Sequence, residues 1–178
     1  MIPDGIVPDD KDWTWVLERP CPECGFDART FDVDTVPVLI RTNAGGWQEV
    51  LEGAGPTSAV RARPDRWSTL EYAAHVRDVF RLYHERLRLM LDTDDPLFAN
   101  WDQDATAVAD RYGDQDPVEV AGELVVAAED LAEAFDAVGG DQWQRPGRRS
   151  DGAAFTVETF ARYMIHDPVH HLWDVSQK

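Results

Sequence analysis

The fold is decided by a stretch in the first half of the 178-residue chain, Trp67-Ser68-Thr69-Leu70-Glu71-Tyr72-Ala73-Ala74-His75-Val76-Arg77-Asp78. Ser68, followed three residues later by Glu71, forms the pattern of a capping box, in which two side chains satisfy free backbone N–H groups at a helix start. Apolar residues then continue at helical spacing as far as Met90. The sequence therefore predicts a long helix from Ser68 to about Asp92.

Three other segments carry a helical signal, and no strand pattern separates them. The expected helices cover residues 34–52, 116–138 and 156–175. Pro117 in a first turn, Thr156 as an N-cap and Gly139-Gly140 as a stop signal mark their ends. Four helices of this length predict an all-α protein, an up-and-down four-helix bundle that occupies residues 34–178 as a single domain.

The first 33 residues do not fit the helical pattern. Four prolines interrupt them, at positions 3, 8, 20 and 22, yet Trp13 and Trp15 make the segment too apolar for a free tail. We expect residues 1–33 to form an irregular extension that wraps across the bundle and buries these rings. The same apolar surface makes a homodimer plausible.

Composition excludes several classes of partner. The net charge is −17 and the only lysines are Lys11 and Lys178, so neither nucleic acid nor an anionic membrane is an expected partner. No apolar run approaches the roughly 20 residues of a membrane span, and the N-terminus lacks the pattern of a signal peptide. Two cysteines are too few for a disulfide scaffold. A cytoplasmic protein that binds a small molecule is expected.

The histidines suggest a metal site. His166 and His170 lie four residues apart, about 40° around a helix, and His75 lies on a second helix. If these helices pack together, three imidazoles converge and leave a coordination position free, as in catalytic metal sites. His84 lies on the far side of its helix from His75. His171 points about 100° away from His170, off the ligand face, but it remains a candidate for a hydrogen bond or for an alternate ligand. Histidines that only pack in the core remain the alternative.

Several other residues are candidates to support such a site. Asp78 and Asp174 are spaced to orient His75 and His170 through hydrogen bonds, and ordinary surface carboxylates are the alternative for both. Pro168 is expected to kink the last helix and so to re-aim its imidazoles. The long polar connection over residues 93–116 and the loop over residues 141–154 are expected to line a pocket. The candidate pocket residues are Asn100, Trp101 and Asp102, with Arg148 or Arg149.

Cys21-Pro22-Glu23-Cys24-Gly25 resembles half of a zinc ribbon, but no second Cys-x-x-Cys follows. Four interpretations remain open: a structural pair of reduced thiols, a redox-active pair, a zinc site completed by other ligands, and a zinc site shared across a dimer. The sequence favours plain structural thiols. The redox interpretation is weaker than the zinc interpretations, because no strand–turn–helix context supports it.

The motifs Trp67-Ser68-x-x-Glu71-x-x-x-His75-Val76-x-Asp78 and His166-x-x-x-His170-His171-x-x-Asp174 together resemble the DinB-like superfamily, over roughly residues 34–176. This superfamily includes thiol-dependent S-transferases and the N-terminal domain of mycothiol-dependent maleylpyruvate isomerase. The resemblance implies a divalent metal, most often zinc or nickel, with His75, His166 and His170 as ligands. It also implies a low-molecular-weight thiol, such as mycothiol, as a cosubstrate.

Two functions follow as hypotheses. The first is a metal-dependent S-transferase or isomerase that presents a thiolate to an electrophile. The alternative is a non-catalytic protein, linked to stress, that binds a metal or a small molecule.

Overall fold

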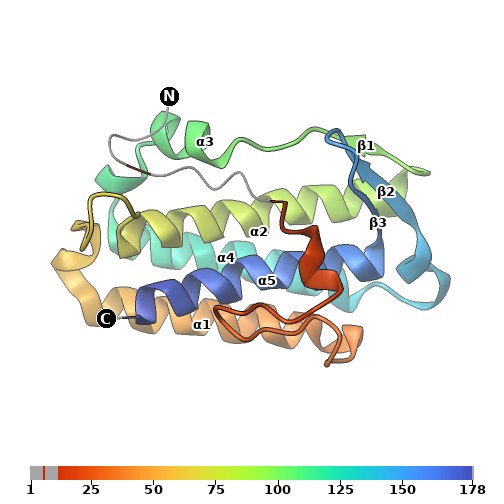
Figure 1. The fold of residues 1–178 in the computed structure, drawn as a ribbon, viewed down its shortest axis with the longest axis horizontal. Helices are drawn as coiled ribbons and strands as arrows, with labels where there is room; N and C mark the ends of the chain where they lie inside the picture. The colour runs from red at the N-terminus through yellow and green to blue at the C-terminus, as the bar shows by residue number, and fades with distance from the viewer. Residues whose placement is uncertain (1–5, 7–11, 178) are drawn as a thin grey trace.

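The computed structural model describes residue 6 and residues 12–177, and it shows four long helices with a small sheet at one end of the bundle (Figure 1). The predicted all-α four-helix bundle is confirmed. Its helices are α1 (Val36–Ala54), α2 (Thr69–Asp92), α4 (Pro117–Asp136) and α5 (Val157–Ser176). Residues 1–5, residues 7–11 and Lys178 lie outside the described residues. They include two prolines of the predicted extension and the N-terminal segment in which no signal peptide was expected.

The helices begin where the capping residues predict. Ser68 Oγ accepts a hydrogen bond from the backbone N–H of Glu71, and the Ser68 N–H donates to the Glu71 carboxylate at 2.7 Å. Thr156 and Thr159 make the equivalent reciprocal pair at the start of α5. These bonds satisfy N–H groups that the first turn of a helix leaves free.

The order of the helices departs from a simple up-and-down arrangement. Both α4 and α5 lie between α1 and α2, with α2 above and α1 below them in Figure 1. The residues just before α4 contact the first half of α2, since Tyr112 bonds Asp78, and the segment after α4 reaches the end of α2, where Arg145 bonds Met90. Helices α2 and α4 therefore run in the same direction, which requires a long return connection.

That connection contains structure of its own. It includes a short strand β1 (Leu97–Phe98), a short helix α3 (Gln103–Ala109) and a 3-10 turn η4 (Tyr112–Asp114). Strand β1 pairs in parallel with β2 (Pro146–Arg149), which pairs antiparallel with β3 (Ala154–Thr156). This sheet was not predicted from the sequence, because strands of two to four residues are too short to show an alternating pattern.

Residues 12–35, which we call the N-terminal strap, lie along α5 (Figure 1). Val16, Cys21 and Ala28 are buried side chains of the strap, whereas Trp13 and Trp15, which we expected to be buried, are half-buried. Arg162 of α5 donates hydrogen bonds to two carbonyl groups of the strap, those of Ala28 and Phe31. The other 3-10 turns are η1 (Thr14–Leu17), η2 (Val33–Thr35), η3 (Gly55–Ala59) and η5 (Gly140–Gln144).

The core runs the length of the bundle. Its largest fully buried side chains come from all four long helices and include Trp47, Phe80, Phe135, Phe160 and Met164. Helix α5 remains continuous through Pro168, whose carbonyl accepts a hydrogen bond from buried Asn43 of α1 at 2.8 Å. No described helix combines the length and the apolar character that crossing a membrane would need.

Candidate functional site

Helix α5 carries two pairs of side chains of the kinds that can ligate a metal. The second pair is shifted by one residue along the helix from the first. His166 and His170 form one pair and Asp167 and His171 form the other, each four residues apart. One residue corresponds to about 100° around a helix, so the two pairs face different neighbours. In the structure, each pair joins a different cluster.

The first cluster consists of His75, Asp167 and His171, and we call it the cavity cluster. The Asp167 carboxylate lies 3.3 Å from Nε2 of His75 and 3.8 Å from Nε2 of His171. One ligand atom from each residue lies within 4.8 Å of the others. His75 is fully buried in α2, where its ring stacks on Trp101 with the ring centres 5.3 Å apart.

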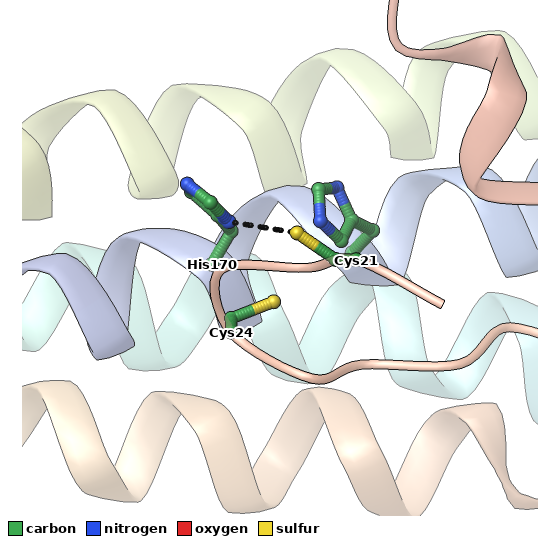
Figure 2. Close-up of side chains that lie close together, drawn as sticks. Cys21, Cys24 and His170 are labelled. Carbon is green, nitrogen blue, oxygen red and sulfur yellow. Dashed lines mark hydrogen bonds between the residues drawn. The ribbon is translucent and has the colours of Figure 1, made fainter. Parts of the chain in front are cut away.

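The second cluster consists of Cys21, Cys24, His166 and His170, and we call it the cysteine cluster. Its ligand atoms also lie within 4.8 Å of one another. Figure 2 shows the two cysteines on the strap turned toward α5, with the Cys21 sulfur 3.7 Å from Nδ1 of His170. Both cysteines are free thiols.

The three predicted ligands are therefore divided between these clusters. His75 belongs to the cavity cluster, whereas His166 and His170 belong to the cysteine cluster. Whether any of them binds a metal stays a prediction. Asp167 was not among the ligands predicted from the sequence, and His171 was considered only as an alternate ligand. The signal that could have found them is their own i, i+4 spacing, in the same short segment.

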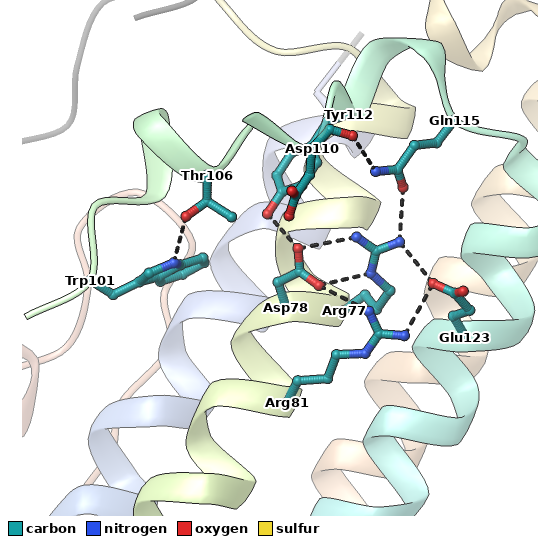
Figure 3. Close-up of polar contacts among 9 residues, drawn as sticks. All are labelled: Arg77, Asp78, Arg81, Trp101, Thr106, Asp110, Tyr112, Gln115 and Glu123. Carbon is teal, nitrogen blue, oxygen red and sulfur yellow. Dashed lines mark hydrogen bonds and ion pairs between the residues drawn. The ribbon is translucent and has the colours of Figure 1, made fainter. Parts of the chain in front are cut away.

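The two aspartates predicted to support the ligands have different surroundings. Asp174 accepts from Nδ1 of His171 at 3.2 Å and lies 3.7 Å from Nε2 of His170, so it contacts one imidazole of each cluster. Asp78 instead binds Arg77, Arg81 and the Tyr112 hydroxyl in a polar network beside α4 (Figure 3). These contacts stabilise the packing of α2 against α4 and the return connection.

The electrostatics of the site favour an ionised Asp167 carboxylate and neutral imidazoles at His166 and His170, the forms that bind a cation. Burial by itself would raise the pKa of Asp167, but the adjacent His75 and His171 outweigh burial and hold that pKa well below its usual range. Burial, with His170 nearby, lowers the pKa of His166 to about 4, and burial also lowers the pKa of His170. These two imidazoles are therefore neutral near pH 7, the form that coordinates metals.

A cavity of about 1190 Å³ opens beside the cavity cluster. Asp167 and His171 line it, together with the predicted pocket residues Asn100, Trp101 and Asp102. Arg149 also lines it, whereas Arg148 is not among the lining residues and pairs with Asp95 at 3.0 Å. Trp101 is held by a hydrogen bond from its Nε1 to Thr106 Oγ1, and Asp102 caps α3.

The sequence matches the DinB superfamily over residues 10–175. The chain belongs to this superfamily. A comparison with curated proteins finds no match to the sequence. Among solved structures, YfiT from Bacillus subtilis is similar in fold, with a TM-score of 0.73 and 15% identity over 84% of this chain and 90% of YfiT. YfiT is described as a probable metal-dependent hydrolase with an unusual four-helix bundle topology.

Proposed function

We propose that this DinB superfamily protein is a metal-dependent enzyme in which His75, Asp167 and His171 hold one divalent cation at the cavity. The observation that carries the proposal is the convergence of three ligand atoms, from α2 and α5, beside a cavity of about 1190 Å³. This ligand set replaces the three histidines expected from the sequence.

The donor set fits a divalent transition metal. Two imidazoles and one carboxylate are ligands that zinc and nickel accept, and three protein ligands leave a position free for a small molecule. His171 also receives the support that metal-bound histidines usually have, because its Nδ1 faces the Asp174 carboxylate at 3.2 Å. Zinc and nickel are the ions we propose.

A low-molecular-weight thiol is the proposed cosubstrate. A cation bound here would act as a Lewis acid and lower the pKa of a thiol or of a water molecule. The cavity is larger than a water nucleophile needs, since ligand pockets for small molecules measure about 300–1,000 Å³. A thiol cosubstrate and an electrophile, such as those of an S-transferase or isomerase, together fit a space of this size.

The chain's own residues would position these reactants. Trp67 and Trp101 contact the His75 ring, with ring centres 5.2 and 5.3 Å away, and shield it from water. Arg149 lines the cavity and donates a hydrogen bond to the Tyr163 hydroxyl at 3.1 Å. The same guanidinium pairs with Asp151 at 2.8 Å, so a carboxylate of the thiol or of its electrophile would bind Arg149 in competition with Asp151.

Hydrolysis is the second candidate, because YfiT, which has a similar fold, is described as a probable metal-dependent hydrolase. In that case the same three side chains would hold the cation, and water would take the place of the thiol. The two candidates differ in one observable: only the first requires an added thiol for turnover.

The test compares metal content in untagged wild-type protein, His75→Ala and the matched control His84→Ala. His84 lies on the same helix but belongs to neither cluster. We expect His75→Ala to lose about one equivalent of zinc or nickel relative to the wild type, and His84→Ala to lose none. Turnover is then measured with a panel of thiols and electrophiles, and without thiol on ester and amide substrates.

Each outcome has a definite meaning. Thiol-dependent turnover that His75→Ala abolishes supports the transferase proposal, whereas turnover without thiol supports hydrolysis. Metal bound at the cavity with neither activity would favour the non-catalytic alternative. Equal metal content in the wild type, His75→Ala and Asp167→Asn would contradict the proposed ligand set.

A further inference from the structure

The cysteine cluster is separate from the proposed chemistry of the cavity. His166 and His170 also line the cavity, but Cys21 is 2% exposed and neither cysteine lines it. Two of its ligands come from the strap and two from α5, which are more than 140 residues apart in the chain. Such a meeting of two thiols and two imidazoles has no role in the proposed reaction.

The strap holds its two thiols in a defined turn. The backbone N–H of Gly25 donates to the Cys21 carbonyl at 2.9 Å, and the Cys21 N–H donates to the Phe26 carbonyl at 2.8 Å. Gly25 has φ of +74°, a conformation that glycine adopts without the strain of a side chain. The turn brings both sulfurs to one side, toward α5 (Figure 2).

The two imidazoles are available to complete a site. Nδ1 of His170 faces the Cys21 sulfur, while its Nε2 lies 3.7 Å from both Glu23 and Asp174, which can fix the tautomer. His166 is 4% exposed, and its Nε2 has no hydrogen-bond partner among the described residues. A buried nitrogen without a partner costs free energy unless a ligand satisfies it.

We propose that Cys21, Cys24, His166 and His170 bind a zinc ion that fastens the N-terminal strap to α5. Two thiolates and two neutral imidazoles are the closed ligand set of structural zinc sites, and sulfur ligands disfavour magnesium and calcium. All four positions are filled by the protein, so the site leaves no place for a substrate. Zinc binding releases the two thiol protons to solvent.

The distances are close to those that zinc needs. Bonds of about 2.3 Å to sulfur and 2.0–2.1 Å to nitrogen place tetrahedral neighbours about 3.3–3.8 Å apart. The Cys21 sulfur and His170 Nδ1 already lie 3.7 Å apart, and the whole set lies within 4.8 Å. Zinc binding would then require these ligand atoms to approach by at most about 1–1.5 Å.

The proposed zinc would also shape the cavity. The Trp13 ring lies with its centre 5.3 Å from both His166 and His170, and Trp13 and Glu23 line the cavity. Fastening the strap to α5 therefore fixes one wall of the space in which we place the reaction. Release of the zinc would free that wall without removing a ligand of the cavity cluster.

Cobalt substitution tests the proposal directly. Reduced, full-length, untagged protein is stripped of metal and titrated with Co²⁺, and absorption is recorded. We expect a thiolate-to-cobalt charge-transfer band and the intense d–d bands of tetrahedral cobalt. Cys24→Ser and His170→Ala should lose the charge-transfer band, whereas His75→Ala, which alters the cavity cluster alone, should keep it. Cys24→His, which keeps four ligands, should retain cobalt with a weaker band.

A second measurement needs no variant. With zinc bound, both thiols of the wild type should react slowly with a colorimetric thiol reagent, and a chelator should make them react many-fold faster. Thiols that react equally fast with and without zinc would overturn the proposal, as would a Cys21–Cys24 disulfide in protein purified with zinc. Absence of the charge-transfer band in the reduced wild type would also overturn it.

This outcome is independent of the proposed function. If the cysteine cluster binds no cobalt, His75→Ala should still lose about one equivalent of metal relative to the wild type. If the cavity cluster binds no metal, the wild type and His75→Ala should both still show the charge-transfer band.

Discussion

At the residue scale, Asp78 lies within one turn of the candidate ligand His75, yet its contacts stabilise the packing of the helices. Its carboxylate accepts a hydrogen bond from the Tyr112 hydroxyl at 2.6 Å and pairs with Arg77 at 2.9 Å. Arg77 is 5% exposed and also binds Gln115 and Glu123 (Figure 3). Because a buried guanidinium needs compensating charge, this network holds the return connection against α2 and α4.

We predict that Asp78→Asn lowers the free energy of unfolding by about 1.5–3 kcal/mol, the usual worth of hydrogen bonds to charged groups. The loss arises because Arg77 keeps only part of its charge compensation. Metal content should not change, since the Asp78 carboxylate binds Arg77, Arg81 and Tyr112 rather than His75. Urea unfolding and elemental analysis measure the two effects.

Arg81→Ala is the matched control for that variant. Its guanidinium is 48% exposed and pairs with the same Asp78, so the expected cost is under about 1 kcal/mol. If Asp78→Asn lost metal at unchanged stability, Asp78 would support His75 as its spacing in the sequence suggested, and its assignment to packing would be wrong.

At the element scale, the start of α2 depends on an ionised carboxylate. Glu71 is 6% exposed, accepts a hydrogen bond from the Ser68 N–H at 2.7 Å and binds Arg61 Nε at 2.9 Å. Burial alone would raise the pKa of Glu71, but Arg61 and Ser68 outweigh it and hold the pKa below its ordinary value of 4.5. The folded state therefore favours the charged form.

This shift predicts a pH-dependent stability. A carboxyl group whose folded pKa lies below its unfolded value stabilises the fold above that unfolded pKa, and the contribution is lost as the pH falls through the folded pKa. We expect Glu71→Gln to lower the free energy of unfolding by about 1.5–3 kcal/mol at pH 7. The difference between wild type and variant should shrink below about pH 4.5.

Urea unfolding of both proteins at pH 7 and at progressively lower pH measures this difference. Glu85→Gln, which removes an exposed carboxylate from the same helix, provides the control and should leave stability within about 0.5 kcal/mol of the wild type. A difference between wild type and Glu71→Gln that stays constant down to pH 3 would show that ionisation of Glu71 contributes nothing.

At the scale of the whole molecule, the strap is joined to the bundle by a few strong contacts. The Arg162 guanidinium donates to the carbonyl oxygens of Ala28 at 2.6 Å and Phe31 at 2.9 Å, and it lies 5.2 Å from the centre of the Phe31 ring. Along the strap, these contacts follow the cysteine turn, whereas Trp13 precedes it. We therefore expect the strap to open locally while the helices stay packed.

We predict that Arg162→Ala increases amide hydrogen exchange in residues 21–31 by about tenfold or more, because charge-assisted hydrogen bonds worth about 1.5–3 kcal/mol are lost. Exchange in α2 and α4 should not change. Hydrogen exchange measured by mass spectrometry resolves these segments.

Arg41→Ala is the comparison variant, because Arg41 joins α1 to α4 through Glu129 and Asp136 and does not contact the strap. It should leave exchange in residues 21–31 unchanged. A uniform rise in exchange across all helices of Arg162→Ala would mean that the strap and the bundle unfold as one unit, contrary to the prediction.

The sequence by itself determined the four long helices and located the segments that carry the candidate ligands. Ser68 with Glu71, Pro117 and Thr156 mark helix starts through local hydrogen bonds and backbone angles, which depend on neighbours within a turn. The His-rich segment of α5 and the Cys-x-x-Cys turn were recognisable for the same reason, since ligand spacing along a chain is a local property.

Only the tertiary structure decided which ligands meet. The sequence singled out His166 and His170, yet Asp167 and His171 have the same i, i+4 spacing. Which pair meets His75 depends on the rotation of α5 against its neighbours. That rotation is set by packing of buried side chains such as Phe160, Met164 and Ile165, and by the strap, which brings Cys21 from the other end of the chain. Contacts between distant segments follow from how the whole core fills space, which no local pattern encodes.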